Sequence, residues 1–206
     1  MSDKEERMLV MPKDAKPAEV RQLYDDFAAT YDEEILPEST YPALLSVVDT
    51  FMEVLGNSDK NIRIIDLGAG TGLAAVELKK HGFANIDGLD LCEEMLKKAK
   101  EKDAYRKYIC EAVTEKRLDI PTGAYDVALS VGAVTSGYIK ASAFDEILRL
   151  TKPGASFDAM IQFNKCTNIP ALSITFGNGN FYNRNYRIKR KAGWTMELTR
   201  LDVCQY

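Results

Sequence analysis

The chain has 206 residues, of which 46% are hydrophobic and 28% charged, a composition that suits one globular domain with a real core. Its net charge of -4 disfavours nucleic acid as a partner, and no apolar run is long enough for a bilayer, so we expect a cytoplasmic protein without membrane association. The four cysteines are far apart in sequence and only one histidine is present, so we expect no metal site.

The amino-terminal part is expected to form an arm followed by a helix. Residues 1–18 are charged and carry two prolines without an apolar period, which predicts a flexible arm ahead of a single domain at 19–206. Apolar residues recur at helical spacing from Val20 to Tyr31. This spacing predicts one amphipathic helix, which Pro37 helps to end.

Beyond this helix, short β-rich runs alternate with helical periods. Further helices are predicted over residues 42–55, 71–80, 93–103 and 141–151. Strands are predicted over residues 63–67, 86–89, 107–110, 125–131 and 156–163. Strands that alternate with helices need crossover connections, so we expect an α/β fold: a Rossmann-like, mostly parallel sheet with helices on both faces and an amino-terminal helical cap.

A glycine-rich turn follows the first predicted strand, in the stretch "RIIDLGAGTG". Gly68, Gly70 and Gly72 alternate there, and glycine lets the backbone turn tightly and approach a ligand. The alternative is that the three glycines only form the turn. Leu73 stands where the dinucleotide fingerprint requires glycine or alanine, so a nucleotide-like ligand other than a dinucleotide is favoured.

Three acidic residues follow three successive predicted strands or end them. Asp66 would repel a pyrophosphate and attract a cation, with roughly 1 kcal/mol between unit charges about 4 Å apart in water and roughly 4 kcal/mol at an intermediate dielectric. Asp90 can accept hydrogen bonds from two ribose hydroxyls, or it caps a helix together with Glu93. Glu111 can accept a hydrogen bond from an exocyclic amine, or it is a solvated loop residue. Together the acids predict a positively charged adenosyl compound.

These segments resemble the motifs of the class I S-adenosylmethionine-dependent methyltransferases. The matching segments are "IIDLGAGTG", "LDLCEEML", "CEA", "YDVALSVGAV" and "LTKPGASF". The segment "LYDDFAATYDEEI" narrows the resemblance to a group of methyltransferase-like proteins within the family. The resemblance implies a Rossmann-like fold, S-adenosylmethionine as cofactor and methyl transfer to an acceptor.

The resemblance also implies a set of cofactor-binding residues. The methionyl end of the cofactor would lie on Asp66, Gly68, Ala69 and Gly70. Asp90 would hold the ribose, and Leu91 and Met95 would pack near the adenine. Glu111–Ala112 would flank the base, with glutamate where relatives commonly have aspartate, and Val131 would lie near the sulfonium.

Two tyrosines on the amino-terminal helix are seven residues apart, so both should point the same way. In related enzymes this segment lies over the cofactor, and an aromatic ring attracts a sulfonium by roughly 0.5 to 2 kcal/mol. Tyr31 is our candidate for this contact. Core packing is an equal alternative for Tyr24 and Phe27.

The acceptor is narrowed only by missing motifs. The fourth strand segment ends in "SVGAVTSGY", without the Asn/Asp-Pro-Pro-aromatic or Pro-Cys signatures of related nucleobase-modifying enzymes, which favours a small-molecule or protein acceptor. We name no catalytic residue, because His81 beside Gly82 is typical of a helix end. The alternatives are a cofactor-binding regulatory or partner subunit without transfer activity, and a nicotinamide-dependent oxidoreductase.

The carboxyl-terminal segment departs from the family pattern. The run "YNRNYRIKRKAGW" predicts a short helix ended by Gly193, and 195–206 predicts one strand. The usual last strand is therefore expected to be missing. Such a sheet has an open edge, which a second copy of the chain or another partner would cover.

Overall fold

The computed structural model describes residues 15–35, 42–134, 138–161, 172–177, 180–182, 186–190 and 196–200. The helices are α2 (Pro17–Phe27), α3 (Tyr31–Ile35), α4 (Pro42–Leu55), α5 (Leu73–Lys80), α6 (Glu93–Glu101) and α7 (Phe144–Leu150), with the short 3-10 helix η1 (Ala141–Ala143). The strands are β1 (Ile64–Leu67), β2 (Ile86–Asp90), β3 (Lys107–Cys110), β4 (Tyr125–Val134), β5 (Thr151–Ile161), β6 (Leu172–Gly177), β7 (Asn180–Tyr182), β8 (Tyr186–Arg190) and β9 (Met196–Arg200).

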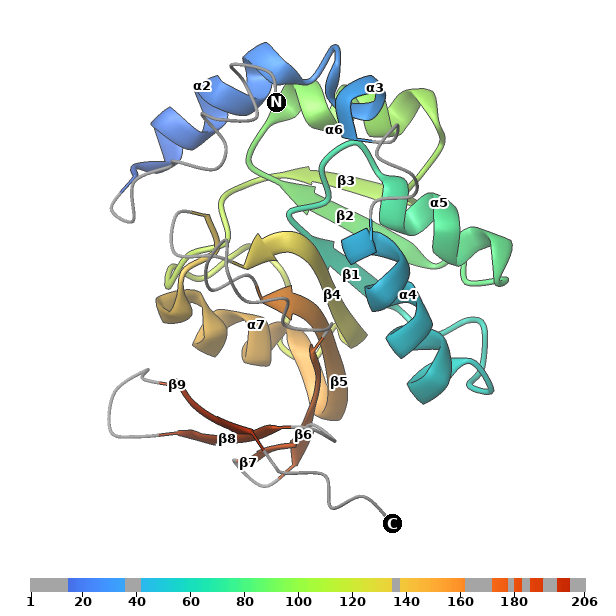
Figure 1. The fold of residues 1–206 in the computed structure, drawn as a ribbon, viewed down its shortest axis with the longest axis vertical. Coiled ribbons are helices and arrows are strands. Elements are labelled where there is room, and N and C mark those ends of the chain that lie inside the picture. Colours follow the sequence, from blue (N-terminus) through green and yellow to red (C-terminus); the bar gives the residue numbers. More distant parts are fainter. Residues whose placement is uncertain are drawn as a thin grey trace.

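One sheet forms the centre of the fold, in the order β3-β2-β1-β4-β5-β6-β7-β8-β9 (Figure 1). The pairings from β3 to β5 are all parallel, and those from β5 to β9 are antiparallel. The parallel half confirms the predicted crossover architecture. All of its carboxyl ends meet at one edge, which brings the loops after β1, β2, β3 and β4 together.

Helices cover both faces of the parallel strands, as predicted. Within β1, Ile64 packs on the face covered by α4, α5 and α6, where Phe51 of α4 is fully buried. Ile65 and Leu67 pack on the opposite face against α7, whose Phe144 is 1% exposed. This alternation follows from the two-residue period of a strand, and it leaves Asp66 on the face of α4, α5 and α6.

The amino-terminal segment forms two helices rather than the single helix predicted. α2 begins at Pro17 and ends at Phe27, a turn follows over residues 28–30, and α3 begins at Tyr31. Phe27 packs against Met95 of α6, so α2 lies across α6 at the carboxyl edge of the sheet (Figure 1). Residues 1–14 of the expected arm and Pro37 lie outside the described residues.

The predicted carboxyl-terminal helix is wrong, because residues 186–190 form strand β8, paired antiparallel with β9. Tyr186 and Ile188 alternate with Arg187 and Lys189, a two-residue period that favours a strand once a neighbouring strand is available. β9 falls within the strand expected over 195–206, of which 195 and 201–206 lie outside the described residues. A partner over the edge strand stays a prediction.

A search of the described residues for membrane-spanning segments finds no helix with the length and apolar character that crossing requires.

Candidate functional site

The glycine-rich turn connects β1 to α5 at the carboxyl edge of the parallel strands (Figure 1). Gly68, Gly70 and Gly72 have φ angles of 74°, 52° and 86°, which residues with a Cβ rarely adopt. A Cβ on Gly68 would collide with Ala133, and one on Gly72 with Ala104. A Cβ on Gly70 would meet no heavy atom of the described residues within 4 Å. Two glycines thus permit close packing behind the turn, whereas Gly70 faces open space.

Asp90 ties the end of β2 to the glycine turn. Its Oδ2 accepts a hydrogen bond from the Gly70 amide at 2.8 Å, and its Oδ1 accepts one from the Cys92 amide at 2.8 Å. Burial raises the pKa of Asp90, and these two amides counteract the rise. The helix cap of α6 is Cys92 rather than Asp90, since the Cys92 sulfur accepts from the Met95 amide at 3.4 Å. A carboxylate offers about four acceptor sites, so Asp90 retains capacity for ligand hydroxyls.

Asp66 lies behind the turn and is 1% exposed. The hydroxyl of Tyr105 donates a hydrogen bond to Asp66 Oδ2 at 2.7 Å. Burial raises the pKa of Asp66 to about 7; the Tyr105 hydrogen bond lowers it, and the charge of Asp90 raises it further. No lysine or arginine in the described part of the chain forms an ion pair with Asp66. The site therefore contains a buried carboxyl group that an external cation would help to ionise.

Tyr105 is part of no motif in the sequence, yet it packs behind the glycine turn, against Asp66. It follows α6 and is 2% exposed. The signal that points to it is Gly88 in the middle of β2, because a glycine inside a strand often marks close approach of a neighbour. A Cβ on Gly88 would come within 2.5 Å of the Tyr105 ring. Gly88 is therefore needed to seat the ring beside Asp66.

The start of α3 contacts the glycine turn through a polar network. Thr71 Oγ1 donates to Asp32 Oδ1 at 2.5 Å, and Lys102 Nζ lies 2.6 Å from Asp32 Oδ2. Lys102 Nζ also donates to the Thr71 carbonyl oxygen at 3.0 Å. This network, which the sequence did not reveal, holds Asp32 against the turn. Tyr31 precedes Asp32 and is therefore also held near the turn.

Aromatic rings gather beside this network. Tyr24 and Tyr31 have ring centroids 6.4 Å apart, which confirms that they point the same way across the break between α2 and α3. Phe27 lies 5.1 Å from Tyr31, and Tyr138, after β4, lies 5.5 Å from Tyr24. Tyr24 and Tyr31 both pack against the buried cluster between α2 and α6. The tyrosines therefore have packing roles whether or not they contact a ligand.

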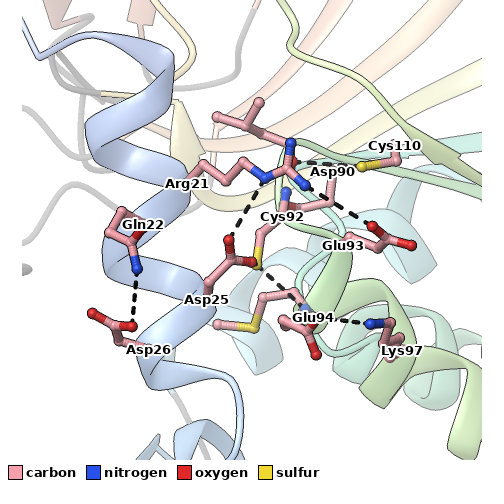
Figure 2. Close-up of polar contacts among 12 residues, drawn as sticks. Arg21, Gln22, Asp25, Asp26, Asp90, Cys92, Glu93, Glu94, Lys97 and Cys110 are labelled. Atoms are coloured by element: carbon pink, nitrogen blue, oxygen red, sulfur yellow. Dashed lines mark hydrogen bonds and ion pairs between the residues drawn. The ribbon is translucent and has the colours of Figure 1, made fainter.

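The contact between α2 and α6 also contains polar groups (Figure 2). Arg21 lies 3.6 Å from Asp25 and 3.9 Å from Glu93, and the Cys92 thiol donates to Asp25 Oδ1 at 2.8 Å (Figure 2). Burial, followed by this hydrogen bond, raises the pKa of the Cys92 thiol to about 12. Cys92 therefore stays protonated at neutral pH and is not a nucleophile.

The other predicted site residues lie directly after β2 and β3, in α6 and within β4. Met95 is 1% exposed and packs between α6 and α2. Glu111 is exposed, and its amide donates to the Asp90 carbonyl oxygen at 3.1 Å. Val131 is half-buried and precedes Gly132, which has a φ of 72° where the β4–β5 pairing is irregular. Two further candidates are half-buried beside these residues, namely Leu91 and Ala112. His81 ends α5, as predicted.

The chain is similar in sequence and in fold to known methyltransferases. Residues 65–158 match the model of a family described as "Methyltransferase domain". Human methyltransferase-like protein 27 is 32% identical over 137 residues, which cover 66% of this chain and 55% of that protein. The chain thus spans about half the length of this relative.

Solved structures share the fold. A provisionally assigned S-adenosyl-L-methionine-dependent methyltransferase from Methanococcus maripaludis has a TM-score of 0.55 and 22% identity, over 68% of this chain and 64% of that one. A provisionally assigned methyltransferase in a complex with the Haloferax volcanii Trm112 methyltransferase activator has a TM-score of 0.53 and 21% identity, over 67% of this chain and 59% of that one.

Over residues 65–158 the chain matches the methyltransferase-domain family model. Together with the curated relative and the shared fold, this match supports a class I S-adenosylmethionine-dependent methyltransferase domain. The cofactor of such methyltransferases is S-adenosylmethionine, and the residues present fit it. Gly70 leaves the turn open, Asp90 has spare acceptor capacity, and Asp66 has no cationic partner among the described residues.

Proposed function

We propose that the protein transfers a methyl group from S-adenosylmethionine to an acceptor that is a small molecule or a protein side chain. The observation that supports this most directly is the hydrogen bond from the Gly70 amide to the Asp90 carboxylate, 2.8 Å long, beside the glycine that faces open space. A carboxylate fixed there can receive both hydroxyls of a ribose while the backbone stays close to the ligand.

The proposed roles of the remaining residues follow from charge and position. Asp66 would hold the positively charged methionyl end, and Tyr31 would lie near the sulfonium. The cofactor supplies a methyl group on a sulfonium, an electrophile that needs no activation. The protein then contributes alignment and exclusion of water, so none of its described side chains has to act as a nucleophile.

The acceptor is the least specified part of the proposal. The net charge of -4 opposes binding of a nucleic acid backbone. Residues 130–138, "SVGAVTSGY", contain neither the Asn/Asp-Pro-Pro-aromatic nor the Pro-Cys signature of nucleobase-modifying enzymes. Both facts support a small-molecule or protein acceptor.

Calorimetric titration with S-adenosylmethionine, followed by a labelled-methyl assay against metabolite and protein pools, tests the proposal. We expect binding and transfer to a component of one pool. Tight binding without transfer to any pool would favour the alternative, a cofactor-binding regulatory or partner subunit. Binding of NAD or NADP in place of the sulfonium compound would contradict both.

The ribose assignment has its own test. We expect Asp90→Ala to weaken binding of S-adenosylmethionine by about 1 to 3 kcal/mol, because hydrogen bonds to a charged group are lost and the Gly70 amide loses its acceptor. Glu101→Gln is the control, since the pair that Glu101 forms with Lys98 on the same helix is exposed. A folded Asp90→Ala protein with the wild-type dissociation constant would refute the assignment.

A further inference from the structure

A single tyrosine hydroxyl faces two acceptors behind the glycine turn. Tyr105 Oη lies 2.7 Å from Asp66 Oδ2 and 3.1 Å from the carbonyl oxygen of Ala69. A hydroxyl has one proton, so Tyr105 donates to one of these acceptors at a time. The two contacts therefore correspond to two alternative hydrogen-bond arrangements.

Both arrangements leave the groups involved with partners. When Asp66 is ionised, Tyr105 donates to the carboxylate, and the Ala69 carbonyl keeps the Gly72 amide as its donor at 3.0 Å. When Asp66 is protonated, its own hydroxyl can donate to Tyr105 Oη, and Tyr105 then donates to Ala69. A buried polar group without a partner is costly. Since both arrangements avoid this cost, the Tyr105 hydroxyl can change its acceptor when Asp66 changes its protonation state.

We propose that Tyr105 is a positioning residue that couples the charge of Asp66 to the hydrogen bonding of the glycine turn. A cation that binds at the turn ionises Asp66: the O–H bond of the carboxylic acid breaks, the proton leaves to solvent, and the Tyr105 hydrogen bond moves from Ala69 to Asp66. The cation is the methionyl end of the cofactor, so this coupling rests on the proposed function.

The titratable and charged groups around Asp66 are compatible with both states. With a pKa of about 7, Asp66 populates both forms near neutral pH. Tyr105 keeps its proton, because burial and then the charge of Asp66 raise its pKa well above 10. From β2, Asp90 faces Asp66 with a like charge, and from β3 the Tyr108 hydroxyl accepts from the Tyr105 amide at 3.1 Å. Lys102, after α6, is engaged in the α3 network.

Carbon NMR of the free protein tests the coupling without any cofactor. With aspartate carboxyl and tyrosine ζ carbons labelled, we expect the Asp66 signal to titrate near pH 7 and the Tyr105 signal to shift with the same midpoint. Tyr105→Phe should raise the Asp66 midpoint by about one pH unit, about tenfold in proton affinity, because the ionised form loses its donor. Tyr125→Phe is the matched control, since the Tyr125 hydroxyl donates to another buried carboxylate, Asp87, at 3.0 Å.

Two results would overturn the proposal. One is an Asp66 midpoint that is the same in wild type and in a folded Tyr105→Phe protein while the control also leaves it unchanged. The other is a Tyr105 signal that stays constant through the Asp66 titration, a measurement on the wild type that needs no variant to fold.

Cofactor titration adds a separate readout. Calorimetry in buffers of different ionisation enthalpy should show proton release on binding at about pH 6, decreasing toward zero above about pH 8, since the free carboxyl group is then already ionised. Binding without proton release at the lower pH would overturn the coupling. Absence of binding would contradict the proposed function alone, and the NMR titrations would still decide the role of Tyr105.

Discussion

Two buried aspartates on neighbouring strands are stabilised in different ways. Asp66 on β1 and Asp87 on β2 are each 1% exposed, and each accepts a hydrogen bond from a tyrosine hydroxyl. Asp87 also forms a two-point contact with the guanidinium of Arg106, at 3.0 and 2.8 Å, and Arg63 lies 3.7 Å away. Asp66 has no cationic partner among the described residues.

This difference distinguishes a carboxylate whose charge is balanced by the protein, Asp87, from one whose charge a bound ligand would balance, Asp66. The charge of Asp87 is compensated within the protein, on the face of the sheet opposite to Gly88. Within the described part of the chain Asp66 has a neutral hydroxyl as its side-chain partner, and burial favours its protonated form. We therefore interpret Asp87 as structural and Asp66 as part of the cofactor site. Substitutions at these and related positions test whether the two aspartates differ in this way.

The largest expected effect is on the structural side. Asp87→Asn removes the charge that Arg106 and Arg63 share, and we expect the free energy of unfolding to fall by about 3 kcal/mol, the lower end for breaking a buried pair, because Arg106 is 52% exposed and can be rehydrated. Urea unfolding at pH 7 measures this loss. The folded variant should bind S-adenosylmethionine like the wild type, and weaker binding would blur the distinction between the two aspartates.

Asp66→Asn should give the opposite pattern. The amide oxygen can still accept from Tyr105, so the fold is retained, but the charge that would meet the cofactor is gone. We expect binding of S-adenosylmethionine to weaken by about 2 kcal/mol, roughly 30-fold, measured by calorimetry at pH 8, where Asp66 is ionised in the wild type. Wild-type affinity in this variant would show that Asp66 does not contact the cofactor.

The same variant should change the pH dependence of stability. The folded-state pKa of about 7 lies above the ordinary value of 3.8, so the folded protein keeps a proton that the unfolded chain releases. The stability due to this protonation is present below about pH 4 and is lost as the pH rises through about 7. Relative to Asp66→Asn, the wild type should therefore lose stability between pH 5 and pH 8, by at most about 1.4 kcal/mol per pH unit. A constant difference in urea unfolding across this range would refute the raised pKa.

The sequence predicted those parts of the candidate site that are formed by residues adjacent in the chain. A strand, an acid and alternate glycines in one stretch predicted the end of β1 with Asp66 and the turn with Gly70. Tyr105 and Lys102 were not predicted, because they reach the turn only when the chain returns from α6 toward β3. Gly88 was the one sign in the sequence that a side chain packs closely on β2. The sign identifies Tyr105 only once the structure shows that its ring fills the space beside Gly88.

The fold shows a similar division. The predicted β3 range, 107–110, is the observed one, because neighbouring turns and helices bound the strand. Helical periodicity joined α2 and α3 into one helix, since spacing alone does not reveal the turn at 28–30 that lets Asp32 face Thr71. Over 186–190 the sequence predicted part of a helix ended by Gly193, but the choice between helix and strand depended on pairing with β9.

The smallest expected effect concerns Asp32, whose ion pair resembles that of Asp87 but is far less buried. The side chains of Asp32 and Lys102 are 26% and 27% exposed, so water screens the pair. Asp32→Asn can still accept from Thr71, but it loses the charge that holds α3, and with it Tyr31, against the turn. We expect S-adenosylmethionine to dissociate about fivefold faster, about 1 kcal/mol, in stopped-flow measurements, with little change in unfolding free energy. Asp26→Asn, an exposed change on α2 next to Gln22, is the control. If both variants release the cofactor at the wild-type rate, the α3 contact only supports the fold, and the functional carboxylates are confined to the strand ends.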